Sequence, residues 1–541
     1  MTHWQASYDT GVPAEINADA FASVSHLFEQ AAAKHADKPA LECFGQTTSF
    51  SSLNDSSRSF AAYLQNELSV KRGDRIALMA PNVPAFVIAM FGILRAGAVQ
   101  VNVNPLYTPR ELKHQLNDAG AETIVVFGGV SATLAEIIDA TPVKRVISLD
   151  LGDGTGLPIP SPAADERLQN VTKLADAITQ GAKLELQDPG LTPDDTVFFQ
   201  YTGGTTGLSK GAVLSHRNIV ANAEQYKAFV PQAVDEGAEV LVGALPLYHI
   251  FGLMLKIAYL SIGGKVLLIP NPRDMDAYID AIKDAKFTVM AGVNTLYAGM
   301  MMHPRIKDVD FSALKVSVGG GAAVIEATSE DWKAVTGTHI KEGYGLSETS
   351  PLLCINPASV ETFSGTCGLP VSSSDVKLLD ENDQVVGIGE RGEICCSGPQ
   401  VMSGYWNNDD ANREAFTKDG YFRTGDIGVF DEAGYLKIVD RKKDMIIVSG
   451  FNVFPNEIEA VVTACEGVAE CACIGVADAK SGEAIKVFAV LTEGSDVTQE
   501  SLIAHCRENL TGYKIPKHIS FLPELPKSNV GKILRRELRD I

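Results

Sequence analysis

The stretch YTGGTTGLSKG, residues 201–211, has the composition of a loop that holds phosphate. Its four glycines would let backbone N–H groups approach an anion closely, and Lys210 supplies a positive charge. Hydroxyl donors come from Thr202, Thr205, Thr206 and Ser209. The spacing differs from the Walker phosphate loop, in which two glycines are separated by four residues and are followed directly by Lys and then Ser or Thr. A flexible turn is the commoner outcome for a glycine-rich run, but this density of hydroxyls behind a predicted strand favours a different nucleotide cradle.

The elements that must position this loop follow an alternating pattern. The sequence predicts strand, buried helix, strand, amphipathic helix and strand at 75–82, 83–98, 99–105, 108–120 and 121–128. The second helix carries its own start signal, with Thr108 at the N-cap, Pro109 at N1 and Glu111 at N3. Strands that alternate with helices indicate an α/β fold with mostly parallel sheets. Further strands are predicted directly before the glycine loop and later in the chain, at 196–201, 265–270 and 287–293.

A change in sequence character after residue 430 indicates a second domain. The pattern predicts two strands separated by a charged break across 434–450, followed by a helix and two β-rich runs, at 456–467, 471–477 and 485–491. We place the boundary at the charged break. This gives a large N-terminal domain of several subdomains, residues 1–440, and a small α+β domain, residues 441–541. Residues 151–195 are rich in Gly, Pro and Asp and are predicted to form a looped excursion.

Length and composition exclude several classes of protein. A chain of 541 residues with 45% hydrophobic and 21% charged residues is typical of a folded protein with two or more globular units. Its formal charge of −21 argues against a nucleic-acid partner and against broad attachment to an anionic membrane. An anionic ligand would need a local basic site, such as residues 510–541, which hold seven Lys or Arg and three Asp or Glu. Nine cysteines without a CxxC pair, and an N-terminus without an apolar core, predict a cytoplasmic protein.

Five motifs, in a fixed order, give the chain a family resemblance. They are YTGGTTGLSKG, EGYGLSETSP (342–351), YFRTGDIG (421–428), DRKKDMIIVSGFNVFPNEIE (440–459) and PKSNVGKILRREL (526–538). Together they resemble the adenylate-forming (AMP-binding) superfamily, which includes acyl-CoA synthetases, peptide-synthetase adenylation domains and beetle luciferases. The stretches NVNPLYTPRELKHQLND, PLYHIFGL, SGYW and SGFNVFPNEIE look most like bacterial long-chain-fatty-acid–CoA ligases. The resemblance covers nearly the whole chain.

This resemblance implies a reaction in two halves. A carboxylate attacks the α-phosphorus of ATP, which gives an acyl-AMP and pyrophosphate, and the thiol of CoA then displaces AMP. The glycine loop is then expected to grip the β- and γ-phosphates through Thr202, Gly203, Gly204, Thr205, Thr206, Gly207 and Lys210. Glu348 is expected to hold Mg²⁺ against these phosphates, because a lone carboxylate with phosphate oxygens suits that hard cation.

Two further groups of residues are expected, from the same resemblance, to hold the AMP portion. Tyr344 would stack on adenine, and Ser347 stands where the family more often has Thr, so a hydroxyl is kept for phosphate. Asp426 would accept hydrogen bonds from both ribose hydroxyls, and Arg441 would reach the same ribose. The backbone around the adenine would come from Gly320, Gly321, Ala322, Gly343 and Gly345.

The family's catalytic lysine corresponds to Lys532, which would bridge the substrate carboxylate and the α-phosphate. Because Lys532 lies in the small domain and the glycine loop in the large one, the small domain must close for the first half-reaction and rotate for the second. Lys443 occupies the family's hinge position. After rotation, Ser449, Gly450 and Phe451 would face the active site, with Gly450 leaving room for the thin pantetheine arm of CoA.

The nature of the acid substrate is the part of the function that the sequence leaves most open. His249 looks like the family's gating aromatic residue at the acyl pocket, although a lone His beside apolar residues is often a hydrogen-bonded core residue. Residues 287–325 are expected to line this pocket. Small side chains there, consistent with a roomy tunnel, are Gly292, Gly299, Gly319 and Ala322.

A fatty-acid–CoA ligase that uses ATP and Mg²⁺ is therefore the leading interpretation. The alternatives are an aryl- or medium-chain-acid–CoA ligase, an acyl-AMP ligase that loads a carrier protein, and a non-catalytic binding protein. The last of these predicts loss of Lys532 or Glu348, and both residues are present. The sequence leaves open a homodimer and a transient, peripheral contact with the inner face of the membrane.

Overall fold

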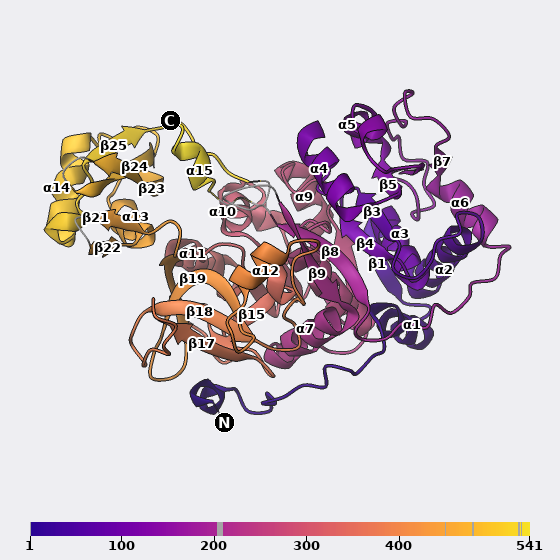
Figure 1. Cartoon of the computed structure of the whole chain (residues 1–541), viewed down its shortest axis with the longest axis horizontal. Coiled ribbons are helices and arrows are strands. Elements are labelled where there is room, and N and C mark those ends of the chain that lie inside the picture. Colours follow the sequence, from indigo (N-terminus) through magenta and orange to yellow (C-terminus); the bar gives the residue numbers. More distant parts are fainter. Residues whose placement is uncertain (1, 203–208, 449–450, 479–480, 529–530, 532) are drawn as a thin grey trace. The chain divides into compact units, whose positions relative to one another are not determined.

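The computed structural model describes residues 2–202, 209–448, 451–478, 481–528, 531 and 533–541. The chain forms two compact units (Figure 1). Unit 1 comprises Met1–Asp375 and Ser397–Thr417, and unit 2 comprises Val376–Cys396 and Lys418–Ile541. The domain boundary predicted at residues 440/441 lies inside unit 2 and stays a prediction.

A seven-stranded sheet in unit 1 carries the glycine loop at one edge. Its strand order is β7-β6-β5-β3-β4-β8-β9, and all neighbours are parallel except β9, which runs antiparallel to β8. The bounds are β3 Arg75–Met79, β4 Val99–Asn102, β5 Thr123–Phe127, β6 Arg145–Leu149, β7 Thr172–Lys173, β8 Thr196–Thr202 and β9 Lys210–Ser215. Strands β3, β4, β5 and β8 confirm the strands predicted in these regions.

A nine-stranded sheet forms the other half of unit 1. In the order β16-β15-β14-β13-β12-β10-β11-β1-β2, the strands from β14 to β1 are parallel and the end strands are antiparallel. The bounds are β1 Pro39–Cys43, β2 Gln46–Ser49, β10 Val240–Gly243, β11 Lys265–Leu268, β12 Val289–Gly292, β13 Val316–Gly319, β14 Ile340–Gly345, β15 Leu352–Ile355 and β16 Leu369–Pro370. The carboxyl ends of the parallel strands meet at one edge, which is where open α/β sheets bind ligands.

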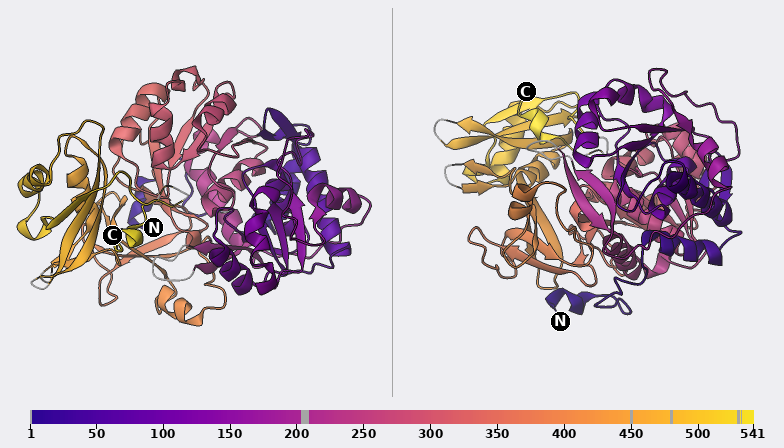
Figure 2. Two further views of the ribbon diagram at one scale, coloured as in Figure 1. Left: turned by 90° about the horizontal axis from the view of Figure 1, so that it is seen from above. Right: turned by 45° about the vertical axis from the view of Figure 1, so that its right-hand side comes forward.

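Helices pack around both sheets of unit 1. Figure 2 shows those of the N-terminal part, in indigo and violet, around the strands of the seven-stranded sheet. The bounds are α1 Val24–Lys34, α2 Phe50–Asn66, α3 Pro84–Arg95, α4 Pro109–Ala119, α5 Ser131–Ala135, α6 Leu174–Gly181, α7 His216–Phe229, α8 Ile250–Ser261, α9 Met275–Ile282, α10 Asn294–Met302, α11 Glu326–Thr336 and α12 Asp409–Ala415. Helix α3 is buried along its whole length, as expected for a helix that is apolar on every side.

Two local predictions have opposite outcomes. The start of α4 is as predicted: the Thr108 hydroxyl accepts a hydrogen bond from the Glu111 backbone N–H, and the Glu111 carboxylate accepts one from the Thr108 N–H. The prediction of a looped excursion at 151–195 is wrong in part, because this segment contains β7 and α6. Helix α6 packs on α2 and buries Leu174 and Ala177. Its apolar face is too short to stand out among flanks rich in Gly, Pro and Asp.

Among its described residues, unit 2 forms two sheets and three α-helices. A four-stranded sheet has the order β17-β18-β19-β20, and a five-stranded sheet has the order β22-β21-β24-β23, with β25 parallel to β24. The bounds are β17 Asp375–Leu379, β18 Gly392–Ser397, β19 Phe422–Phe430, β20 Leu436–Arg441, β21 Ile446–Val448, β22 Phe451–Val453, β23 Val468–Asp478, β24 Gly482–Leu491, β25 His518–Phe521, α13 Pro455–Thr463, α14 Gln499–Asn509 and α15 Arg535–Leu538. The strands and helix predicted after residue 430 are confirmed. So is the fold class: an α/β chain with large, mostly parallel sheets and a smaller C-terminal α+β part.

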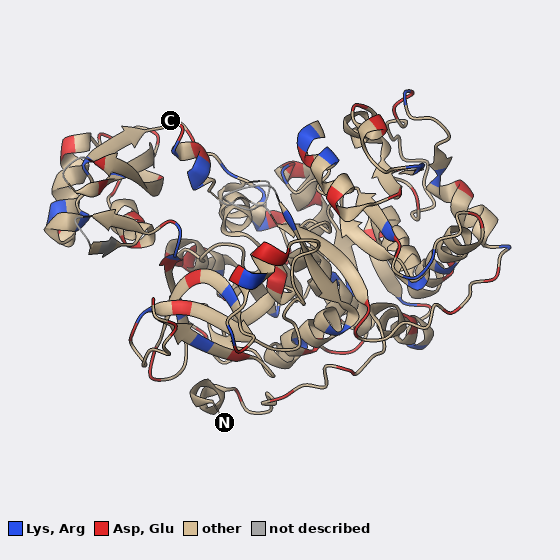
Figure 3. Ribbon diagram, viewed as in Figure 1, with Lys and Arg blue, Asp and Glu red and all other residues tan. Residues whose placement is uncertain are grey.

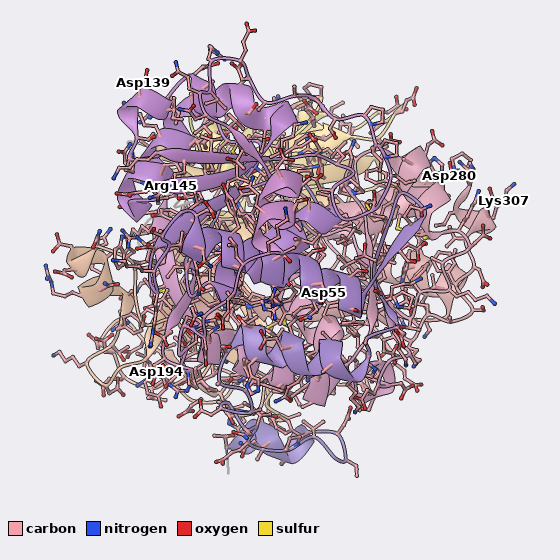
Figure 4. All side chains as sticks on the ribbon, turned by 90° about the vertical axis from the view of Figure 1, so that its right-hand side faces the viewer. Asp55, Asp139, Arg145, Asp194, Asp280 and Lys307 are labelled. Atoms are coloured by element: carbon pink, nitrogen blue, oxygen red, sulfur yellow. The ribbon has the colours of Figure 1, made fainter. Side chains whose placement is uncertain are left out.

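Charged residues are distributed over both units. Figure 3 shows Lys and Arg interspersed with Asp and Glu along the elements. Exposed examples in unit 1 are Asp139, Asp280 and Lys307, which lie at the outside of the molecule in Figure 4. Within the described ranges, no helix has both the length and the apolar character needed to cross a membrane.

Candidate active site

The two strands that flank the glycine loop bring its ends together. Strand β8 ends at Thr202 and β9 begins at Lys210, and these two residues are direct partners across the antiparallel pair. The carbonyl oxygen of Ser209 lies 2.8 Å from the His114 Nε2 atom on α4, so the loop exit is tied to the predicted amphipathic helix. The candidate phosphate-binding residues between these ends, Gly203, Gly204, Thr205, Thr206 and Gly207, lie outside the described residues.

Strand β14 delivers the second group of candidates. Tyr344 is buried near its end, and Glu348, which is 7% exposed, lies in the short 3-10 helix Ser347–Thr349 that follows. A Cβ atom at Gly345 would lie 1.7 Å from the Pro351 carbonyl oxygen, so only glycine fits this position. This 3-10 helix packs against β8 and β9. The structure therefore brings Glu348 to the strands that hold the ends of the glycine loop.

The GGGA turn after β13 meets β14 at the carboxyl edge of the nine-stranded sheet. Gly320 is buried, and a Cβ atom there would lie 3.0 Å from the Phe251 ring and 3.3 Å from the Gly343 carbonyl oxygen. Gly321 has a φ of +80° and Ala322 is exposed. The Glu342 carboxylate accepts a hydrogen bond of 2.8 Å from the Val324 backbone N–H and so fixes the end of this turn to β14. Burial raises the pKa of Glu342 to about 7.

His249 lies at the start of α8, beside this turn. Its Nδ1 atom accepts a hydrogen bond of 3.3 Å from the Phe251 backbone N–H, so the imidazole caps the helix. The loop before it is held by Asn82, whose side chain donates to the Leu245 carbonyl oxygen and accepts from the Leu247 N–H. The local hydrogen bond gives His249 a structural role, and a gating role at the acyl pocket stays a prediction.

A buried lysine supports the same loop. Lys256 is 3% exposed, and its Nζ atom donates a hydrogen bond of 2.6 Å to the Leu245 carbonyl oxygen. Gly243 makes room for it, because a Cβ atom at this glycine would lie 3.0 Å from the Lys256 Cε atom. Burial lowers the pKa of Lys256 from 10.5 to about 7. Sequence analysis did not single out this residue.

Lys256 is expected to make stability depend on pH. The folded state releases this proton near pH 7 and the unfolded chain holds it up to about pH 10.5, so the unfolded state binds more protons in between. The free energy of unfolding should therefore rise with pH, by about 1.4 kcal/mol per pH unit, relative to Lys256→Met. Urea unfolding of both proteins between pH 7.5 and 9.5 measures this difference, with the exposed Lys307→Met as a matched control. A difference that stays constant across these pH values would contradict the expectation.

Tyr405 connects Glu348 with Lys210. Its hydroxyl donates a hydrogen bond of 2.8 Å to Glu348 Oε1, and the Lys210 Nζ atom lies over its ring, 5.1 Å from the centroid. Burial and the neighbouring Glu348 carboxylate raise the pKa of Tyr405 well above its usual range, which keeps the phenol protonated. Sequence analysis gave Tyr405 no role, although the motif SGYW contains it.

In unit 2, Asp426 and Arg441 form a pair across β19 and β20. They are direct partners in the sheet, Asp426 is buried, and its Oδ1 atom lies 3.1 Å from the Arg441 Nε atom. Lys443 is exposed two residues further on. Phe451 is 55% exposed and stacks on Tyr513 with ring centroids 4.7 Å apart. The candidates Ser449, Gly450 and Lys532 lie outside the described residues.

The chain on either side of Lys532 is anchored in unit 2. Lys527 and Ile533 form an antiparallel bridge, and the Leu534 N–H donates to the Pro526 carbonyl oxygen at 2.8 Å. Arg535 then pairs with Glu459 of α13 at 2.7 Å. The residues on the two sides of Lys532 are thus joined to each other, and Arg535 ties them to α13.

The donor set around Glu348 fits Mg²⁺ only if a substrate contributes oxygens. In the part of the chain that the structure describes, no three His, Cys, Asp or Glu side chains gather as a metal-binding group. Glu348 offers carboxylate oxygen, which Mg²⁺ prefers, and this ion typically takes its other ligands from phosphate and water. The residues present are therefore compatible with a metal bound together with ATP.

The chain belongs to the family of AMP-binding enzymes. Residues 28–406 match the family model described as AMP-binding enzyme, and residues 457–532 match the AMP-binding enzyme C-terminal domain. The resemblance drawn from the five motifs is therefore confirmed.

Its relatives include CoA ligases of fatty and aromatic acids. A long-chain-fatty-acid–CoA ligase of Escherichia coli O6:H1 is 48% identical over 549 residues, covering 99% of this chain and 98% of the relative. A feruloyl-CoA synthase of Amycolatopsis sp. is 35% identical over 472 residues, covering 87% and 89%. The crystal structure of the anthranilate CoA ligase AuaEII in complex with anthranoyl-AMP superposes with a TM-score of 0.86 at 25% identity, covering 97% of this chain and 98% of that one.

Proposed function

We propose that this protein is an AMP-forming fatty-acid–CoA ligase. It joins a fatty acid to CoA with consumption of ATP, through an acyl-adenylate, and releases AMP and diphosphate. The observation that carries the proposal is the 48% identity, over 99% of the chain, to a long-chain-fatty-acid–CoA ligase. Tyr405 contacts both Glu348 and Lys210 beside the ends of the glycine loop, and this supports the same chemistry, because both charges suit a metal-bound triphosphate.

In the first half-reaction the chain's main task is to position the triphosphate and balance its charge. A bond forms between a substrate carboxylate oxygen and the α-phosphorus, and the bond from that phosphorus to pyrophosphate breaks. Lys210 and the glycine loop hold the departing phosphates, and Glu348 would hold Mg²⁺, which would supply positive charge against these phosphates. Fixed charges and donors of this kind lower a barrier because they need no reorganisation as the reaction proceeds.

Separate groups of residues are assigned to the adenine and to the ribose of AMP. Tyr344 stacks on adenine beside the GGGA turn, with Gly320 giving close access. The Asp426 carboxylate accepts hydrogen bonds from the ribose hydroxyls, and Arg441 holds this carboxylate in place. One carboxylate can make all these contacts because its two oxygens accept several hydrogen bonds.

The second half-reaction needs a different arrangement of the small C-terminal domain, residues 441–541. Lys532 bridges the carboxylate and the α-phosphate during adenylation and must leave before a thiol can reach the acyl carbonyl. Rotation about Lys443 then presents Ser449, Gly450 and Phe451 to the pantetheine arm. The sulfur of CoA bonds to the acyl carbon, and the bond from that carbon to the AMP oxygen breaks.

The test is product analysis with a panel of acids. AMP and acyl-CoA are measured with saturated acids from C6 to C18 and with cinnamate, with CoA present or withheld. We expect acyl-CoA chiefly from long-chain acids, and only enzyme-bound acyl-AMP when CoA is withheld. A preference for cinnamate would favour an aryl-acid ligase, and release of acyl-AMP without thioester would favour transfer to a carrier protein.

A further inference from the structure

One segment of unit 1 is held against β9 by its backbone. The segment Ser403–Trp406 lies alongside this strand, because the Val213 N–H donates to the Gly404 carbonyl oxygen at 2.9 Å and the Trp406 N–H donates to Gly211 at 2.8 Å. Between them, Tyr405 faces Ala212 in an antiparallel bridge.

Further contacts hold Trp406 and the backbone of Tyr405 in place. The Trp406 indole donates to the Asp118 carbonyl oxygen at 3.1 Å and packs against Phe199 with ring centroids 4.7 Å apart. The Asn412 side chain accepts from the Tyr405 N–H at 2.6 Å and donates to its carbonyl oxygen at 3.0 Å. Tyr405 thus projects from a backbone that has little freedom to move.

The side chain of Tyr405 lies between two opposite charges. Glu348 accepts from its hydroxyl and the Lys210 ammonium lies over its ring. The Lys210 ammonium therefore contacts the ring of the same side chain whose hydroxyl donates to the Glu348 carboxylate. Opposite charges attract more strongly in a partly buried site than in water, so the side chain that contacts both groups affects how each is oriented.

We propose that Tyr405 is a positioning residue that keeps Glu348 and Lys210 apart and aims each at the metal-bound triphosphate. Its hydroxyl orients the carboxylate, and its ring holds the ammonium by a cation–π contact. This rests on the proposed function, since it assigns Tyr405 to the site where that function places Mg²⁺ and the phosphates. It also explains why a tyrosine, which offers both a donor and a π face, suits this position.

The test separates the two halves of the tyrosine. Tyr405→Phe keeps the ring and removes the hydroxyl. We expect it to weaken Mn²⁺ binding, measured by electron paramagnetic resonance in the presence of a non-hydrolysable ATP analogue, by about tenfold, with a KM for ATP within about twofold of wild type. Tyr405→Leu removes the ring too and should also raise the KM for ATP about three- to fivefold. Tyr226→Phe, which removes another buried phenol in α7, is the matched control and should change neither quantity.

A double-variant comparison distinguishes positioning from simple support of the fold. If Tyr405 acts through Glu348, Tyr405→Phe should have almost no further effect on Mn²⁺ binding in a Glu348→Gln background. Additive losses, or a loss of thermal stability without any change in Mn²⁺ binding, would overturn the proposal. Asn412→Ala removes two hydrogen bonds to the Tyr405 backbone and keeps the phenol, so it should weaken Mn²⁺ binding less than Tyr405→Phe does. This variant replaces Tyr405→Phe in the test if Tyr405→Phe does not fold.

Failure of this proposal and failure of the proposed function give different results. Pyrophosphate exchange by the wild-type enzyme is measured first. No exchange with any acid would refute the ligase function itself. Normal wild-type exchange with unchanged Mn²⁺ binding in Tyr405→Phe would refute only the role of Tyr405.

Discussion

Lys532→Ala is expected to slow acyl-adenylate formation by about 10²- to 10³-fold, the usual effect of removing one group that stabilises transition-state charge. As the carboxylate approaches the α-phosphate, two anionic groups come together, and an ammonium between them offsets the repulsion. At about 4 Å and an effective dielectric constant of about 20, one such contact contributes of order 4 kcal/mol before desolvation. ATP-dependent pyrophosphate exchange with palmitate measures this half-reaction.

The second half-reaction supplies the internal control for this variant. Thioester formation from supplied palmitoyl-AMP and CoA requires neither the triphosphate nor the bridging cation, so its rate should stay within about threefold of wild type. Lys527→Ala removes a nearby lysine that pairs with Glu470 at 2.6 Å, and it should leave both half-reactions close to normal. Equal losses in both half-reactions of Lys532→Ala would contradict a role confined to adenylation.

The local elements around the site could be predicted because each carries its own periodic signal. Helix α3 is apolar on every side, and α4 has a complete capping box, so both were evident from short windows of sequence. Helix α6 escaped prediction because its eight residues give too little amphipathic pattern among turn-forming neighbours. Likewise, nothing local indicates that Val376–Cys396 packs with the C-terminal part of the chain.

Residues of the site could be identified from the sequence only where they lie in a motif whose residue types indicate their chemical role. Lys210 stood out because an ammonium among glycines and hydroxyls suits a phosphate, and Glu348 was singled out through the family motif that contains it. Tyr405 did not stand out, because its importance depends on a segment pairing with β9 from about 190 residues further along the chain. Lys256 was also missed, because a lysine in an apolar helix usually extends its ammonium group into solvent, and only the structure shows that this one is buried.

Glu348→Gln is expected to reduce adenylation by about 10²- to 10³-fold for a different reason, the loss of the carboxylate that holds the metal. The substitution keeps the shape of the side chain and an oxygen that can still accept from the Tyr405 hydroxyl, so the fold should be retained. Thioester formation from supplied acyl-AMP should again be spared.

Metal dependence separates this variant from Lys532→Ala. Without the Glu348 charge, the Mg²⁺ concentration for half-maximal pyrophosphate exchange should rise at least tenfold, and high Mg²⁺ should restore part of the rate. In Lys532→Ala the same half-saturation value should stay within about twofold of wild type, since Lys532 contacts substrate rather than metal. Glu361→Gln, at an exposed position in the loop between β15 and β16, provides a matched loss of one acidic charge in unit 1. If Glu348 binds the metal directly, loss of its charge must change the Mg²⁺ concentration that pyrophosphate exchange requires. An unchanged Mg²⁺ dependence in Glu348→Gln would therefore contradict the role of Glu348 as a metal ligand.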